Sequence, residues 1–173
     1  MNRQGALLGS FVFFWVAPAT VAGVIPWALT GLRIRPALFG ASALPWLGCV
    51  LIGAGASVVV ESFVRFAVKG RGTPAPVAPT AHLVVSGLYR YVRNPMYVGV
   101  LSVIVGQALV LGSVLLLEYA ALVWMCVFAF VVLNEEPSLQ HRFGYGYEDY
   151  RANVPRWWPR TTPWQDNGGA RAS

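Results

Sequence analysis

Two short stretches of the sequence concentrate the side chains that could do chemistry. The first, residues 89–97, reads YRYVRNPMY, in which Asn94 is a good N-cap residue and Pro95 a good first helical residue. A helix that begins there exposes unpaired backbone N–H groups and partial positive charge, which suit a ligand's carboxylate or phosphate. Arginines and tyrosines are also typical of membrane interfaces, so this stretch alone favours an interfacial anchor.

The second stretch, residues 134–160, reads NEEPSLQHRFGYGYEDYRANVPRWWPR. In it, Glu135 and Glu136 directly follow a long apolar run, and Pro137 can begin another helix. Adjacent carboxylates at that place can accept hydrogen bonds from hydroxyl groups or face a cation. Aromatic side chains that could stack on a ligand or form the walls of a pocket lie in both stretches: Tyr89, Tyr97, Tyr147, Trp157 and Trp158.

The elements that must position these side chains are membrane helices. Of the 173 residues, 56% are hydrophobic and 12% are charged, and the mean hydropathy is +0.55, far from an ordinary soluble domain. Apolar stretches long enough to cross a bilayer as helices lie at about residues 6–30, 43–64, 96–112 and 114–133. The first is longer than the core of a signal peptide and should stay in the mature protein. We therefore expect an all-α, polytopic membrane protein of about four transmembrane helices, forming a single membrane domain over residues 1–173.

The basic residues predict how these helices are oriented. With four spans, all Lys and Arg residues except Arg33 and Arg35 fall on one side, which the positive-inside rule makes cytoplasmic. That side holds both termini, a loop over residues 65–95 and a short helical tail over residues 134–173. We expect a multi-pass protein of a bacterial inner membrane, whose charge of +6 reflects topology and some attraction to membrane lipids. Nucleic acid is not an expected partner, because no long basic run is present.

The third and fourth spans should form a tight antiparallel hairpin. Only residues 111–113 separate them, and Gly99, Gly106 and Gly112 would permit close backbone approach. The hairpin returns Asn94 to the same membrane face as the two glutamates, so the two chemical stretches should be neighbours.

Some polar and proline residues within the spans have a structural explanation. Pro18 and Pro26 should bend the first span, a fault that neighbouring helices can repair in a membrane. Glu61 and Arg65 are four residues apart and should pair on one helix face. Neither a disulfide nor a cysteine-based metal site is expected from the two cysteines, Cys49 and Cys126.

A ligand for the combined site would match its mixed chemistry. The helix start suits an anion, the glutamates suit hydroxyl groups or a cation, and the aromatic residues suit a flat ring. S-adenosylmethionine carries a carboxylate, a ribose diol, a purine and a positive centre, although other nucleotides also remain possible on these grounds.

The two stretches together resemble a known family. LVVSGLYRYVRNPMYVG, followed after the hairpin by NEEPSLQHRFGYGYEDYRANVPRW, is similar to the isoprenylcysteine carboxyl methyltransferase and phospholipid methyltransferase group of integral membrane enzymes. The resemblance covers about residues 70–160 and implies a cytoplasmic pocket for S-adenosylmethionine. The catalytic residues stay unknown, and no metal is expected. The cofactor-binding positions that the resemblance implies are Ala81, His82, Leu83, Val84, Tyr89, Asn94, Pro95, Met96, Tyr97 and Glu135, with Glu136 beside it.

Two departures from the prenylcysteine enzymes bear on the substrate. Asn94 stands where the family has histidine and cannot accept a proton near neutral pH. Val131 stands where an arginine is associated with the substrate carboxylate. A carboxylate clamp would have to come from Arg142 or Arg156, or the acceptor is a lipid amine, a thiol or another small amphiphile. In every case we expect a lipophilic or lipidated substrate that enters from the bilayer; the sequence indicates no oligomeric state.

Two other functions are compatible with parts of the pattern. Membrane sterol reductases have a similar helical hairpin and bind a nicotinamide dinucleotide, whose extra phosphates call for more cationic groups. A non-catalytic membrane protein could also retain the same scaffold.

Overall fold

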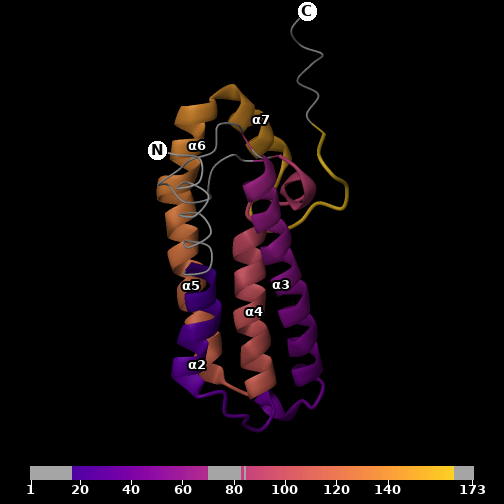
Figure 1. Cartoon of the computed structure of the whole chain (residues 1–173), viewed down its shortest axis with the longest axis vertical. Helices are drawn as coiled ribbons and strands as arrows, with labels where there is room; N and C mark the ends of the chain where they lie inside the picture. Colours follow the sequence, from indigo (N-terminus) through magenta and orange to yellow (C-terminus); the bar gives the residue numbers. More distant parts are fainter. Residues whose placement is uncertain (1–16, 70–82, 84, 166–173) are drawn as a thin grey trace, which may run out of the picture.

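The fold is a bundle of helices. The computed structural model describes residues 17–69, 83 and 85–165. Figure 1 shows long helices running side by side, with two short helices covering one end. No strand occurs within the described ranges, so the predicted all-α class is confirmed there. The α-helices are α2 (Ile25–Thr30), α3 (Leu44–Lys69), α4 (Pro95–Leu111), α5 (Val114–Phe130), α6 (Glu136–Phe143) and α7 (Tyr145–Asn153).

Among the described residues, two helical stretches are long and apolar enough to cross a membrane, Leu44–Arg65 and Val114–Phe143. Two shorter apolar helices, Ala17–Thr30 and Pro95–Leu111, accompany them, so the described helices fall at all four predicted spans. Residues 6–16 of the first predicted span lie outside the described part of the chain. The outer faces carry many exposed apolar side chains, as expected for a helical membrane protein: examples are Trp46, Val50, Leu122, Trp124 and Met125.

Helices α3 and α4 pack through glycines. A Cβ atom on Gly55 would lie 2.6 Å from the Gly99 carbonyl oxygen, and one on Gly106 would lie 2.7 Å from the Gly48 carbonyl oxygen. Small residues at such contacts allow two helix backbones to approach closely. We expected Gly99 and Gly106 to serve the hairpin with the fourth span, but they face α3. Spacing in the sequence identified the close contact and assigned it to the wrong partner.

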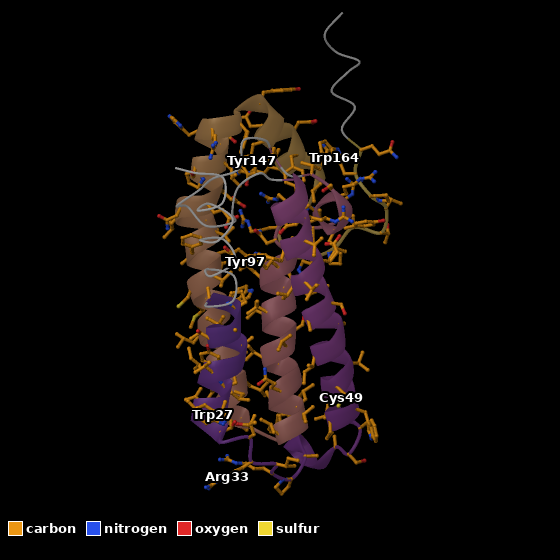
Figure 2. All side chains as sticks on the ribbon, viewed as in Figure 1. Trp27, Arg33, Cys49, Tyr97, Tyr147 and Trp164 are labelled. Atoms are coloured by element: carbon orange, nitrogen blue, oxygen red, sulfur yellow. The ribbon has the colours of Figure 1, made fainter. Side chains whose placement is uncertain are left out.

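The predicted hairpin of the last two spans is confirmed. Helix α4 ends at Leu111 and α5 begins at Val114. Between them Gly112 has a φ of +64°, and a Cβ there would lie 2.3 Å from the Pro36 carbonyl oxygen. Glycine is therefore needed both for the backbone conformation and for space. Figure 2 places Arg33 at the end of the bundle opposite Tyr147 and Trp164.

A π-helical turn over Thr20–Val24 interrupts the first helix just before Pro26. Ile25 donates its N–H to the Thr20 carbonyl, five residues back, and Pro26 has no N–H to donate. The carbonyl groups of Val21 and Ala22 thus lose their α-helical donors. They accept instead from the Tyr119 hydroxyl at 2.9 Å and from Gln107 Nε2 at 2.7 Å. This confirms that neighbouring helices satisfy the backbone where Pro26 interrupts it.

A second π-helical turn, Val131–Glu135, joins α5 directly to α6. Here Glu136 donates its N–H to the Val131 carbonyl, and Pro137 again follows without an N–H. The helix therefore continues through this turn to Phe143, beyond the predicted end of the fourth span at residue 133. The π-helical turn changes the direction in which the side chains that follow it project, and both glutamates lie at this point.

Candidate functional site

Glu135 contacts the start of α4, which confirms that the two chemical stretches are neighbours. Tyr97, in the first turn of α4, donates its hydroxyl to Glu135 Oε2 at 3.2 Å. Both residues are partly buried. The described residues make no hydrogen bond to Glu135 Oε1, the second carboxylate oxygen. Glu135 is thus held by one oxygen and can offer the other to a ligand.

Glu136 is held by two arginines. Arg93 Nη1 lies 2.8 Å from Glu136 Oε1, while Arg156 donates from Nε to Oε1 at 2.6 Å and from Nη2 to Oε2 at 2.8 Å. The Glu136 and Arg93 side chains are only 8% and 9% exposed, and that of Arg156 is 26% exposed. The hydrogen bonds that Arg156 donates to Glu136 raise the pKa of the Arg156 guanidinium. This ion triad, Arg93–Glu136–Arg156, ties α6 to the segments on either side of it in space.

A cluster of tyrosines lies behind the ion triad. Arg93 Nη1 donates to the Tyr147 hydroxyl at 3.2 Å, and Tyr147 packs with Tyr150 and Val154 in a buried cluster that also includes Leu83. Burial raises the pKa of both Tyr147 and Tyr150. Both phenols therefore stay neutral. Tyr147, expected as a possible wall of the pocket, is 2% exposed and forms part of this core.

The segment after α7, Val154–Trp164, folds back along the residues that precede α4; we call it the C-terminal strap. Figure 2 shows Tyr147 and Trp164 at the same end of the bundle. Arg93 donates its backbone N–H to the Pro155 carbonyl, Arg160 to the Tyr91 carbonyl, and Trp164 to the Arg90 carbonyl, each at 2.9 Å. Arg90 Nε returns a bond to the Trp164 carbonyl at 2.7 Å. The sequence did not predict this contact.

Asn94 also binds the C-terminal strap. The helix begins at Pro95 as predicted, but the Asn94 side chain makes no capping hydrogen bond. Its Nδ2 group donates instead to the Arg156 carbonyl at 3.3 Å. Asn94 therefore helps to place Arg156, and the expectation that its side chain caps the helix is wrong.

Aromatic rings of α5 and the strap lie next to Arg156 of the ion triad. Trp124 and Phe128 have ring centroids 5.3 Å apart, and Phe128 stacks on Trp157 of the strap at 6.2 Å. Arg156 Cζ lies 5.8 Å from the Phe128 ring centroid. The Trp157 indole N–H is buried without a partner among the residues described. Trp158, expected beside it, is 82% exposed.

The remaining predicted site residues differ in burial and in partners. His82 and Val84, with Ala81, lie outside the described residues, and Leu83 packs on the tyrosine cluster. Tyr89 is 7% exposed, and its carbonyl accepts from the Tyr150 hydroxyl at 2.6 Å. Pro95 is buried and Met96 half-buried at the start of α4. Arg142 is exposed on α6, where its Cζ lies 5.6 Å from the Phe143 ring centroid.

Other charged and sulfur groups lie apart from these contacts. Glu61 and Arg65 pair as predicted, and both cysteines are free. Within the described ranges no group of His, Cys, Asp and Glu residues is arranged to hold a metal ion.

Comparison with known proteins gives two matches. The family model described as phospholipid methyltransferase matches residues 44–146. A protein-S-isoprenylcysteine O-methyltransferase from Schizosaccharomyces pombe is 38% identical over 73 residues. That similarity covers 42% of this chain and 31% of the relative, so the chain aligns with about a third of it. Because the family match runs from α3 through α6 and includes both Tyr97 and Glu135, the chain belongs to the phospholipid methyltransferase family.

Proposed function

We propose that this protein transfers a methyl group from S-adenosylmethionine to a lipophilic acceptor at the cytoplasmic face of a membrane. The observation that carries the proposal is the contact between Tyr97 and Glu135, which joins the start of α4 to the end of the α5 helix. It leaves one carboxylate oxygen available at the place where the family resemblance expects the cofactor. Membership of a methyltransferase family supports the reaction type.

The residues present fit this cofactor. A carboxylate with one uncommitted oxygen suits a ribose hydroxyl or a cationic group, and S-adenosylmethionine has both. The Phe128 and Trp157 rings offer an aromatic surface beside it. S-adenosylmethionine supplies an activated methyl group on a sulfonium, so the protein needs no nucleophile of its own.

The protein's part in such a reaction is to align donor and acceptor and exclude water. Tyr97 orients the Glu135 carboxylate by donating to one oxygen. The ion triad holds the C-terminal strap over the beginning of α4. In this proposal the strap therefore closes the cytoplasmic side of the pocket.

The acceptor is proposed to come from the bilayer. The exposed apolar faces of α3 and α5 support helices that lie in a bilayer. The distribution of Lys and Arg supports four spans with both termini in the cytoplasm. The name of the fission yeast relative supports a prenylcysteine-type carboxylate, with a lipid amine, a thiol and a small amphiphile as the other acceptor types. Arg156 uses Nε and Nη2 for Glu136, which leaves Nη1 for an acceptor carboxylate.

A nicotinamide-dependent reductase is the less favoured alternative. Its cofactor carries additional phosphates, which need cationic partners. Here Glu136 already engages both Arg93 and Arg156, which leaves Arg156 Nη1 for a single carboxylate but too few cationic groups for several phosphates.

Calorimetry of the detergent-purified protein tests the cofactor. We expect S-adenosylmethionine and S-adenosylhomocysteine to bind and NADPH not to bind. Binding of NADPH alone would point to a reductase, and binding of none of the three to a non-catalytic scaffold. Glu135→Ala should abolish measurable binding of S-adenosylhomocysteine, and unchanged affinity would remove Glu135 from the site.

A further inference from the structure

The two π-helical turns use the same local arrangement. In each, five residues form the turn, the next residue donates its N–H five residues back, and a proline follows: Thr20–Val24 with Ile25 and Pro26, and Val131–Glu135 with Glu136 and Pro137. By position, Val132 is the counterpart of Val21. Each of these residues loses its helical donor for two reasons. The residue four positions later, which would donate in an α-helix, donates its N–H to the carbonyl five residues before it. The residue five positions later is proline and has no N–H.

The first turn has side-chain donors, and no described side chain plays that part for Val132 in the second. Tyr119 donates to the Val21 carbonyl at 2.9 Å. No side chain in the described part of the chain donates a hydrogen bond to the Val132 carbonyl. Leaving a main-chain carbonyl at the end of a membrane helix without water or another hydrogen-bond donor costs free energy. The Val132 carbonyl is therefore ready to accept from a bound molecule.

Val132 lies on the helix face that carries the site residues. Residues three and four apart share a helix face, so Val132 groups with Phe128, Glu135 and Glu136. Phe128 stacks on Trp157, Glu135 contacts Tyr97, and Glu136 meets the arginines. Val132 is therefore close along the helix to the Glu135 carboxylate.

A free donor lies on the same aromatic surface. The Trp157 indole N–H is buried and has no partner among the described residues, and its ring is 6.2 Å from the ring of Phe128. Phe128 is one helical turn before Val132. An acceptor and a donor that both neighbour Phe128 suit a ligand group that carries both a cation and an anion.

We propose that the Val132 carbonyl and the Trp157 indole N–H bind the zwitterionic amino-acid end of the methyl donor. The carbonyl accepts from its ammonium group, and the indole N–H donates to its carboxylate. The inference rests on the proposed function, because it assigns contacts within the same pocket. It adds a backbone group and a strap residue that the family resemblance did not supply.

Pro137→Ala tests the carbonyl, because the new N–H can donate to Val132 or to Leu133 and compete with the ligand. We expect affinity for S-adenosylhomocysteine, measured by calorimetry, to fall about tenfold, as for a lost hydrogen bond to a charged group. Affinity for methylthioadenosine, which has no amino-acid end, should stay the same. Trp157→Phe, which keeps the stacking ring, should give the same selective loss.

Pro26→Ala is the matched control, since it alters the same motif in the first helix and should leave both affinities unchanged. Equal loss of both ligands in Pro137→Ala would indicate general damage and overturn the proposal, as would no loss of either. If Pro137→Ala does not fold, Trp157→Phe provides the test, through the ratio of its affinities for S-adenosylhomocysteine and methylthioadenosine. Failure of the wild-type protein to bind either ligand would instead overturn the proposed function.

Discussion

At the scale of single residues, two adjacent glutamates have different roles. Glu135 keeps one oxygen free beside Tyr97, whereas Glu136 neutralises Arg93 and Arg156. The sequence predicted that the glutamates would meet the start of α4, because a hairpin must return both to one face. It could not predict that the two glutamates have different partners, since Arg156 reaches Glu136 only through the irregular strap.

Glu135→Gln should weaken S-adenosylhomocysteine binding by about ten- to a hundredfold, because a neutral amide replaces a charged acceptor. Calorimetry measures the change. Glu118→Gln is the control, because Glu118 is an exposed carboxylate elsewhere on α5. This variant should bind S-adenosylhomocysteine with unchanged affinity. Equal effects of the two substitutions would contradict the assignment.

Removal of Arg93 should destabilise the protein more than removal of Arg156. The Arg93 side chain is 9% exposed and that of Arg156 is 26% exposed, so the first is the more deeply buried partner of Glu136. Breaking a buried ion pair from one side costs about 3–5 kcal/mol. Thermal unfolding of Arg93→Ala and Arg156→Ala in detergent compares them, and the reverse order would refute this description of the triad.

At the scale of elements, hydropathy located the helices well because apolar length is a local property of the sequence. Helix partners were harder to predict. Gly99 and Gly106 marked a close contact, but nothing local distinguishes a contact with α5 from one with α3. The continuation of α5 to Phe143 was also missed, because a π-helical turn lets the helix pass the Pro137 that suggested a new start.

Gly55→Ala should lower the unfolding temperature, whereas Gly53→Ala should not. A Cβ on Gly55 would lie 2.6 Å from the Gly99 carbonyl oxygen, and Gly53 has nothing within 4 Å. Overpacking costs about 1–3 kcal/mol, while alanine in an open helical position gains up to about 1 kcal/mol. Differential scanning fluorimetry of both variants measures this. Equal unfolding temperatures would show that the α3–α4 contact is looser.

At the scale of the whole molecule, the C-terminal strap completes a site begun by the membrane helices. The sequence indicated the membrane helices and the pairing of two chemical stretches. It did not predict the strap, whose backbone bonds to Arg93, Tyr91 and Arg90 follow no periodic pattern. The doublet Trp157–Trp158 next to Arg156 is the available signal, but the sequence alone predicts only that these rings could form the walls of a pocket.

A chain that ends after Asn153 should lose S-adenosylhomocysteine binding, because it lacks Arg156, Trp157 and all strap bonds to the start of α4. A chain that ends after Gln165 retains every one of these contacts and should bind as the full chain does. Calorimetry on both truncated proteins makes the comparison. Binding by the shorter chain would show that the strap is dispensable for the pocket.

Incorporation of a labelled methyl group tests methyl transfer to a lipophilic acceptor. Purified protein is incubated with methyl-labelled S-adenosylmethionine and, separately, with membrane lipid extract, a prenylcysteine analogue and a small thiol. We expect label in at least one organic-extractable product with the wild-type protein and none with Glu135→Ala. Absence of labelled product from all three acceptor classes, or equal labelling by Glu135→Ala, would contradict it.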